Sequence, residues 1–177
     1  MKAMLAAIGP LIPALRRYAR SLVRDGSNAD DLVQDCLERA VSRWQQRREA
    51  DARSWMFSIL HNVAIDHIRR KERQGRHIPL QDAADEESAL AYAPPQEEAV
   101  RHTELLRALD TLPQEQRAVL LLIAVESVSY TEAAQVLKIP IGTVMSRLAG
   151  ARERLRCALE GDSGNGASRG ARLRRIK

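Results

Sequence analysis

Apolar side chains in the first 74 residues recur at spacings of three and four, the pattern of helices that bury one face. This pattern predicts three helices, with a polar stretch from Gln45 to Asp51 between the second and the third. Before the second helix, the string Ser27-Asn28-Ala29-Asp30 resembles a capping box with Ser27 as the N-cap. The three stripes are Leu11, Leu15, Tyr18, Ala19 and Leu22; then Leu32, Val33, Cys36, Leu37, Ala40, Val41 and Trp44; then Trp55, Met56, Ile59, Leu60, Val63 and Ile68.

A second group of helical patterns begins near residue 100. It predicts one helix from Val100 to Leu109 and another that starts at Pro113 and runs through the apolar residues 119–123. Ser129-Tyr130-Thr131-Glu132 is a capping box that opens a helix to Leu137, and a break at 138–140 precedes a helix from Gly142 to Leu159. Two helices joined by so short a turn predict a helix-turn-helix. The expected fold class is therefore all-α, with two small helical domains.

Composition supports this division of the chain. The 177 residues carry a net charge of +5, and only 3% are aromatic, which disfavours an all-β fold. The charge falls in blocks: +5 over residues 1–74, −5 over the Pro-containing stretch 75–100, +1 over 101–160 and +4 over 161–177. We expect a first unit (1–74), a flexible acidic linker (75–98), a second unit (99–160) and a disordered basic tail (161–177). No membrane span or signal peptide is evident, and the two isolated cysteines fit a reducing cytoplasm.

The last helix of the helix-turn-helix carries residues suited to DNA. Small polar side chains near its start, Thr143 and Ser146, suit a major groove, and Arg147, Arg152 and Arg154 suit flanking phosphates. The alternative is an amphipathic surface helix, because cationic side chains favour helix C-termini in any protein.

A second polar surface is predicted on the third helix of the first unit. Asn62, Asp66, Arg69 and Arg73 lie at spacings that share one face, with Arg70 and Lys71 beside them and Trp55 near the helix start. Aromatic stacking, amide hydrogen bonds and a basic surface together suit an opened nucleic-acid strand. The alternative is that the tryptophans belong to the core and the arginines to an ordinary solvated helix end.

Other features argue against catalysis and metal binding. The acidic side chains of the second helix, Asp31, Asp35 and Glu38, share a face with no His or Cys at ligand spacing, so a protein contact is the better reading. The four histidines form no metal-binding motif, and the sequence has no nucleotide-binding glycine loop or nucleophile elbow. We therefore expect no metal, no cofactor and no enzymatic activity.

Two sets of strings resemble one family. The strings 29–35 (ADDLVQD) and 54–70 (SWMFSILHNVAIDHIRR) resemble region 2 of the extracytoplasmic-function sigma factors, a branch of the sigma-70 family. The strings 112–117 (LPQEQR), 129–134 (SYTEAA) and 139–148 (IPIGTVMSRL) are similar to their region 4. The resemblance covers most of residues 10–159 in the expected order and spacing.

The resemblance implies a role for each surface. It implies that Asp31, Gln34, Asp35 and Glu38 contact the coiled coil of the polymerase β′ subunit, and that region 4 meets the β flap. It implies that the opened −10 strand is bound by the third helix and the loop 46–53 before it. On the −35 duplex, it implies that Ser146 reads bases, that Met145 and Ala149 meet thymine methyl groups, and that Arg147 and Arg152 bind phosphates. The candidate −10 residues are Trp55, Asn62, Asp66, Arg69, Arg70 and Arg73, and the candidate −35 residues are Thr143, Met145, Ser146, Arg147, Ala149 and Arg152.

Two positions depart from the family pattern. Lys138 stands where the turn usually has Gly, and a left-handed conformation there is expected at modest cost. Gly150 stands where an Arg is common, which removes a possible DNA contact and places a Gly inside a helix.

The implied function is an alternative sigma factor that is a cytoplasmic monomer when free, binds core RNA polymerase and promoter DNA, and is masked by an anti-sigma factor, often a membrane protein in this family. Two rival functions stay open. One is a stand-alone helix-turn-helix regulator, which binds duplex DNA as a dimer. The other is a sigma mimic that sequesters an anti-sigma factor.

Overall fold

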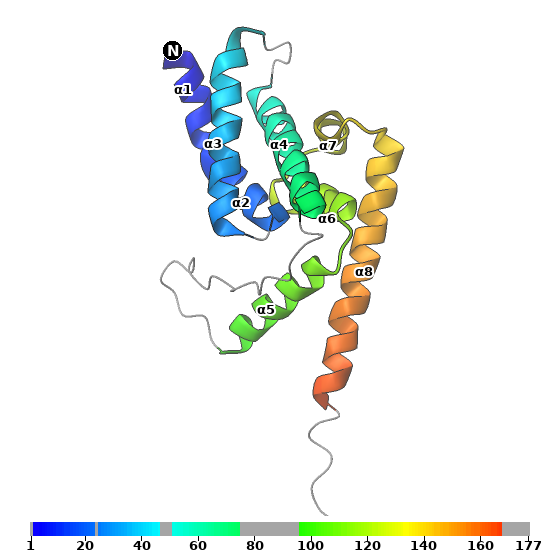
Figure 1. The fold of residues 1–177 in the computed structure, drawn as a ribbon. Helices are drawn as coiled ribbons and strands as arrows, with labels where there is room; N and C mark the ends of the chain where they lie inside the picture. The colour runs from blue at the N-terminus through cyan, green and yellow to red at the C-terminus, as the bar shows by residue number, and fades with distance from the viewer. Residues whose placement is uncertain (1, 24, 47–50, 75–95, 168–177) are drawn as a thin grey trace, which may run out of the picture.

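The computed structural model describes residues 2–23, 25–46, 51–74 and 96–167, and every regular element in these ranges is helical (Figure 1). The predicted all-α fold with two helical units is confirmed. Most of the predicted linker (75–95) and the end of the predicted tail (168–177) lie outside the described residues. Among the described helices, none combines the length and the apolar character that a bilayer crossing needs.

The first unit is a bundle of α2, α3 and α4, and a short helix, α1, precedes the bundle in the chain. Its elements are α1 (Lys2–Ile8), the 3-10 turn η1 (Gly9–Leu11), α2 (Ile12–Val23), α3 (Gly26–Arg43), the 3-10 turn η2 (Trp44–Gln46) and α4 (Ala52–Gln74). Tyr18 and Phe57 meet edge to face at the centre, with ring centroids 5.5 Å apart, and both are buried. Each buried aromatic or leucine contributes about 1.5–3 kcal/mol by leaving water, so the predicted stripes become one core.

Cys36 lies in this core with no exposed surface, as its place in the apolar stripe predicts. Burial raises the pKa of its thiol to about 12, against the opposing charge of Arg39. The thiol is therefore neutral and donates weakly to the backbone carbonyl of Met56 at 3.6 Å.

The start of α3 corrects one prediction. The N-cap is Asp25, whose Oδ1 accepts from the backbone N–H of Asn28 at 3.2 Å, so Ser27 lies inside the helix and is exposed. Asp25 also accepts from the side-chain amide of Asn28. Asp is as good an N-cap as Ser, and its two carboxylate oxygens serve both donors of Asn28, so the helix starts two residues earlier than predicted.

The second unit consists of α5 (Gln96–Asp110), α6 (Gln114–Leu120), the π-helical turn η3 (Leu121–Val125), α7 (Tyr130–Leu137) and α8 (Ile141–Ala167). The capping box at the start of α7 is confirmed in both directions between Ser129 and Glu132. Lys138 adopts the left-handed conformation, with φ 55° and ψ 44°, as expected for the turn of the helix-turn-helix. Pro113 is the N-cap of α6 rather than its first helical residue.

Helix α8 is longer than the sequence pattern indicates. It begins at Ile141 and continues to Ala167, past the predicted end at Leu159 and into the segment predicted to be a disordered tail. Its buried side is Val144, Leu148 and Ala151, which packs on α6 and α7. The other side of its first turns is left to solvent.

The two units pack against one another, an arrangement that no local sequence pattern indicates. Helix α7 lies between α4 and α8 and contacts both (Figure 1). Side-chain bonds cross the boundary, including one from the Ser58 hydroxyl to the carbonyl oxygen of Val136 at 3.3 Å. The buried apolar residues of both units accordingly form a single cluster.

Candidate nucleic-acid interface

Helix α3 presents an acidic surface to solvent. Asp31, Gln34, Asp35 and Glu38 are all exposed and share one side, while Leu32, Val33 and Cys36 on the opposite side are buried. The Gln34 amide donates to Glu38 Oε1 at 3.1 Å, so these two side chains support one another across one turn. The structure brings the four predicted polymerase contacts together as an open anionic face.

Asp30, next to this face, has a different role. Its carboxylate lies 3.5 Å from Arg16 Nε and 3.3 Å from Arg20 Nη2, which ties the start of α3 to α2. The acidic residues at the start of α3 therefore have two roles. Asp30 forms ion pairs within the first unit, whereas the acidic side chains of the predicted polymerase face are exposed to solvent. Among the described residues no set of three His, Cys, Asp or Glu side chains is arranged to hold a metal.

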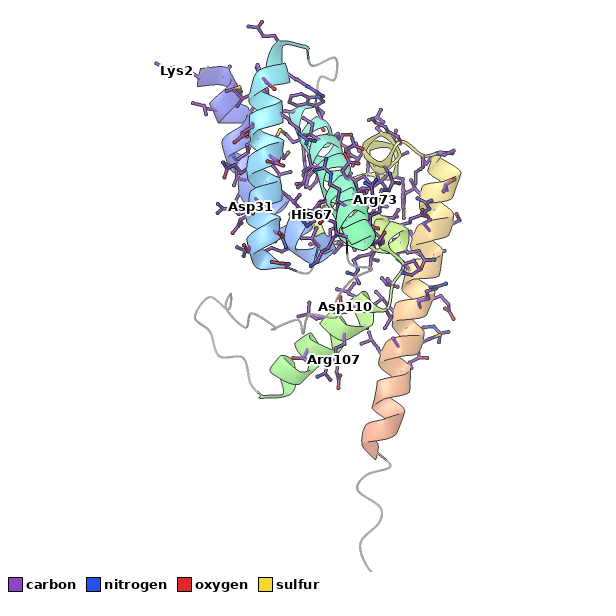
Figure 2. All side chains as sticks on the ribbon, in the orientation of Figure 1. Lys2, Asp31, His67, Arg73, Arg107 and Asp110 are labelled. Carbon is purple, nitrogen blue, oxygen red and sulfur yellow. The ribbon has the colours of Figure 1, made fainter. Side chains whose placement is uncertain are left out.

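Helix α4 carries a polar stripe backed by the core. Asn62, Asp66, Arg69 and Arg73 are exposed and recur at spacings of four, three and four, and Arg70 is exposed beside them. The opposite side of the helix is the buried row Phe57, Leu60, Val63 and Ala64, which fixes its rotation. Figure 2 shows Arg73 near the C-terminal end of α4 and Asp31 on α3, so the cationic and anionic surfaces come from different helices of one unit.

Trp55 lies on the same side of α4 as this stripe, two turns before Asn62. Its ring packs edge to face on Trp44, with centroids 6.0 Å apart, and both rings are partly buried at the margin of the core. Phe57, in contrast, has no exposed surface. The core interpretation therefore holds fully for Phe57, whereas the tryptophan pair keeps an edge in solvent.

The loop before α4 ends in a cap. The backbone N–H groups of Arg53 and Ser54 and the Ser54 hydroxyl all donate to the Asp51 carboxylate, at 3.0, 3.0 and 2.7 Å. Burial opposes ionisation of Asp51, but these hydrogen bonds and the charge of Arg53 outweigh it and lower the pKa of the carboxyl group. Residues 47–50, in the loop predicted to shape a base pocket, lie outside the described residues.

Helix α8 exposes four of its six predicted DNA residues on one side. Met145, Ser146, Ala149 and Arg152 are exposed, and the Met145 side chain is half in solvent. The Ser146 hydroxyl donates to the carbonyl oxygen of Thr143 at 3.1 Å. Two of these side chains, Ser146 and Ala149, are short, which suits the close approach of a helix to the bases of a major groove.

Thr143 and Arg147 are partly buried, and Arg147 reaches toward α6. The Arg147 guanidinium lies 2.6 Å from the Glu115 carboxylate and is only 27% exposed. It lines a cleft of about 260 Å³ at the boundary of the two units, together with His61 and Arg69 of α4. Arg147 is therefore engaged inside the protein, apart from the four exposed residues.

Gly150 has a packing reason in this structure. A Cβ built at this position would lie 2.9 Å from Gln116 Nε2, so the bare backbone lets the Gln116 side chain of α6 approach α8. Position 150 thus faces α6. The glycine that stands where the family often has an arginine therefore affects the packing of α8 on α6 as well as a possible DNA contact.

Sequence reasoning missed the residues at the boundary between the units. Arg17, Arg53 and Glu126 were assigned no role, although Glu126 interrupts the apolar run 118–128, where an acidic side chain is buried only with a partner. It also missed His61, whose Nδ1 lies 3.0 Å from the Tyr18 hydroxyl. Burial, helped by the charge of Arg69, lowers the pKa of His61 to about 4, so the ring is neutral at pH 7.

Comparisons with known proteins agree with the division of the chain into two helical units. The Sigma2 domain of PhyR matches residues 8–61, and Sigma-70 region 4 matches residues 102–155. The chain is 33% identical to the ECF RNA polymerase sigma factor EcfG of Rhodopseudomonas palustris over 150 residues, which cover 84% of this chain and 80% of that protein.

Two solved structures are also similar. The sigma factor RpoE of Bartonella quintana, crystallised with the anti-sigma factor NepR, is 29% identical, with a TM-score of 0.75 over 90% of this chain and 98% of RpoE. The anti-anti-sigma factor PhyR of the same organism is 21% identical, with a TM-score of 0.54 over 85% of this chain and 48% of PhyR, which shows a shared fold alone. Given the two matched regions and a relative that aligns along most of its length, this chain belongs to the extracytoplasmic-function RNA polymerase sigma factors.

Proposed function

We propose that this chain binds core RNA polymerase and directs it to a set of promoters, under the control of an anti-sigma factor. The observation that carries the proposal is that three exposed surfaces occur in one chain. They are the acidic face of α3, the polar stripe of α4 and the face of α8 formed by Met145, Ser146, Ala149 and Arg152. A stand-alone helix-turn-helix regulator has use for the third surface only.

The acidic face is suited to a basic partner surface. Asp31, Gln34, Asp35 and Glu38 are assigned to the β′ coiled coil, where their exposure leaves all four available without rearrangement. On the second unit, Leu105 and Leu106 of α5 are 40% and 49% exposed and give an apolar surface for the β flap. Rim charges at such interfaces chiefly raise the association rate and select the partner.

The α4 stripe is assigned to the −10 strand. Arg69, Arg70 and Arg73 supply charge for phosphates, while Asn62 and Asp66 offer amide and carboxylate groups to base edges. Trp55, at the start of the same stripe, offers the exposed part of its ring for stacking. Unstacking a base costs a few kcal/mol, which polymerase binding and the −35 contacts must offset.

The exposed face of α8 is assigned to the −35 duplex. Ser146 reads base edges, Met145 and Ala149 meet thymine methyl groups, and Arg152 binds phosphate. Thr143, at the start of the helix, is assigned to a phosphate. Arg147 joins this set when it exchanges Glu115 for a phosphate. The protein acts as a monomer when free, since one chain carries both DNA-reading helices.

An anti-sigma factor is the third partner. The crystal structure of the similar protein RpoE contains the anti-sigma factor NepR, which supports a partner of the same kind here. Such a factor, free or membrane-bound, would keep the protein from core polymerase until a signal releases it.

The test is transcription with purified core RNA polymerase and a promoter library. The expected result is open complexes and transcripts from a small set of promoters, which are lost with Asn62→Ala and retained with Arg156→Ala. Arg156 is a suitable control because it pairs with Glu153 and Glu160 of its own helix. Duplex binding by a dimer without polymerase would instead identify a helix-turn-helix regulator.

A second function is favoured by one observation, the match of residues 8–61 to the Sigma2 domain of PhyR. PhyR is an anti-anti-sigma factor, so this chain could instead be a mimic that sequesters an anti-sigma factor. A mimic would release another sigma factor from its anti-sigma partner and yield no transcripts with core polymerase. The exposed arginines of α4 weigh against it, because a mimic has no need of phosphate contacts.

A further inference from the structure

A buried carboxylate joins the two units. Glu126, between η3 and α7, has only 2% of its surface exposed. Both of its oxygens accept from Arg17 of α2, at 3.2 Å from Nε and 3.0 Å from Nη2. A bidentate arginine–carboxylate pair of this kind is directional as well as strong.

A second arginine of the first unit reaches the same residue. Arg53, in the first turn of α4, donates through Nη2 to the backbone carbonyl of Glu126. Its guanidinium lies 5.9 Å from the centroid of the Phe57 ring, so it is anchored on the core of the first unit. Glu126 is thus held through its side chain by α2 and through its backbone by α4.

This arrangement conflicts with simultaneous binding of two promoter elements. Helix α7 contacts both α4 and α8, so two packing distances of about 8–10 Å separate the −10 helix from the −35 helix. Elements near −10 and −35 are separated by roughly 25 base pairs, which is on the order of 85 Å of duplex at 3.4 Å per step. The packed form can therefore engage one element, and the units must separate for both.

We propose that Glu126 is a latch: its contacts with Arg17 and Arg53 hold the free protein in the packed form, and they release when polymerase and promoter draw the units apart. The proposal rests on the proposed function for its consequence, but the latch itself is a property of the free chain. The polar nature of the contact suits a reversible closure, because a carboxylate and two guanidinium groups become hydrated once the units separate. A purely apolar boundary would offer no such alternative partner.

The experiment measures the separation of the units in the full chain. A donor dye on the N-terminus and an acceptor on Cys157, the exposed thiol of α8, report it by energy transfer. Glu126→Gln and Arg17→Gln each remove one side of the charge pair and are expected to lower the transfer efficiency. Arg17→Gln is the safer variant for folding, because the Arg17 side chain is 57% exposed.

Two controls sharpen the measurement. Arg156→Gln removes an arginine whose ion pairs stay within α8, and it should leave the transfer efficiency unchanged. The charge swap Arg17→Glu with Glu126→Arg should restore part of the efficiency that either single change removes. Circular dichroism of every variant confirms that the helices are intact.

The proposal also predicts a gain of function. Because the packed form engages only one promoter element, Arg17→Gln should tighten binding of DNA that carries both elements by the free protein about 10-fold, in proportion to the larger open population. Equal transfer efficiency in wild type, Glu126→Gln and Arg17→Gln would overturn the latch. Transcription with core polymerase is measured separately. Unchanged energy transfer with normal transcription would overturn the latch alone, whereas lowered energy transfer without any transcripts would overturn the proposed function alone.

Discussion

Arg147 of α8 and Glu115 of α6 form an ion pair of 2.6 Å that turns the arginine away from the exposed face of its own helix. In the proposed −35 complex this arginine must leave a carboxylate to reach a phosphate. The pair therefore sets part of the cost of binding duplex DNA.

Removing the competing carboxylate should strengthen DNA binding. Glu115→Gln is expected to raise the affinity for −35 duplex a few-fold, because Arg147 no longer has to leave a carboxylate to reach its phosphate. Arg147→Ala removes that phosphate contact and should flatten the slope of log affinity against log salt by about 0.9. Fluorescence anisotropy across a salt series measures both, with Arg156→Ala as the control, and equal slopes for all variants would remove Arg147 from the DNA contacts.

The neutral, buried His61 predicts an acid sensitivity of folding. Its pKa is about 4 in the folded protein against 6.5 for an ordinary histidine, so between these values the unfolded chain binds a proton that the folded chain does not. The free energy of unfolding should be constant above pH 6.5 for this group and fall by up to about 3 kcal/mol as the pH drops to 4.

Urea unfolding between pH 7.5 and 5 tests this sign. The lowered pKa values of Asp51 and Glu132 place their losses of stability below pH 4.5, outside that range. His61→Gln should flatten the dependence between pH 7.5 and 5. A slope that persists unchanged in this variant would show that another group carries it.

Substitutions at Trp55 and at Phe57 should affect different properties, with Phe57 needed for stability and Trp55 for opening of promoter DNA. Phe57→Ala removes a ring with no exposed surface and is expected to cost about 3–5 kcal/mol of stability. Trp55→Ala removes a partly buried ring and should cost less, yet reduce open-complex formation by core polymerase. Chemical denaturation and permanganate footprinting of the promoter measure the two effects, and intact opening in folded Trp55→Ala would leave this ring a purely packing role.

Gly150 gives a test of packing between α6 and α8. Gly→Ala inside a helix gains about 1 kcal/mol, but the new methyl group meets the flexible end of Gln116. That end must shift, and Gln116 Oε1 is buried without a hydrogen-bond partner, so the shift sacrifices little. We expect Gly150→Ala to stabilise the protein by less than 1 kcal/mol in the wild-type background and by nearly the whole of about 1 kcal/mol in a Gln116→Ala background. Thermal unfolding measures both changes, and a net loss of stability in both backgrounds would contradict this expectation.

Local structure was predictable where one sequence signal had no competitor. The capping box at Ser129 and the left-handed Lys138 are examples, because each depends on residues within one turn. At α3 two caps competed, and Asp25 prevailed over Ser27 since its carboxylate serves two donors of Asn28. The end of α8 was misplaced because glycines that disfavour a helix in isolation do not stop one that continues from a packed segment.

The relation between the units was beyond such reasoning. The exposed sets on α3, α4 and α8 follow from helical periodicity, so each face could be drawn from the sequence. The pairing of Arg17 with Glu126 joins residues 109 positions apart, and periodicity carries no information about it. Only the isolated acid within the apolar run 118–128 hinted that a distant cation was needed.

The two cysteines differ so much in their surroundings that the rates at which their thiols react with a labelling reagent report on unfolding. Cys157 is exposed on α8 and will react with thiol reagents in the folded protein. Cys36 has no exposed surface and a pKa of about 12, so it stays unreactive until the first unit opens. The rate at which a second label appears therefore measures every opening that exposes the core of the first unit, without any engineered probe.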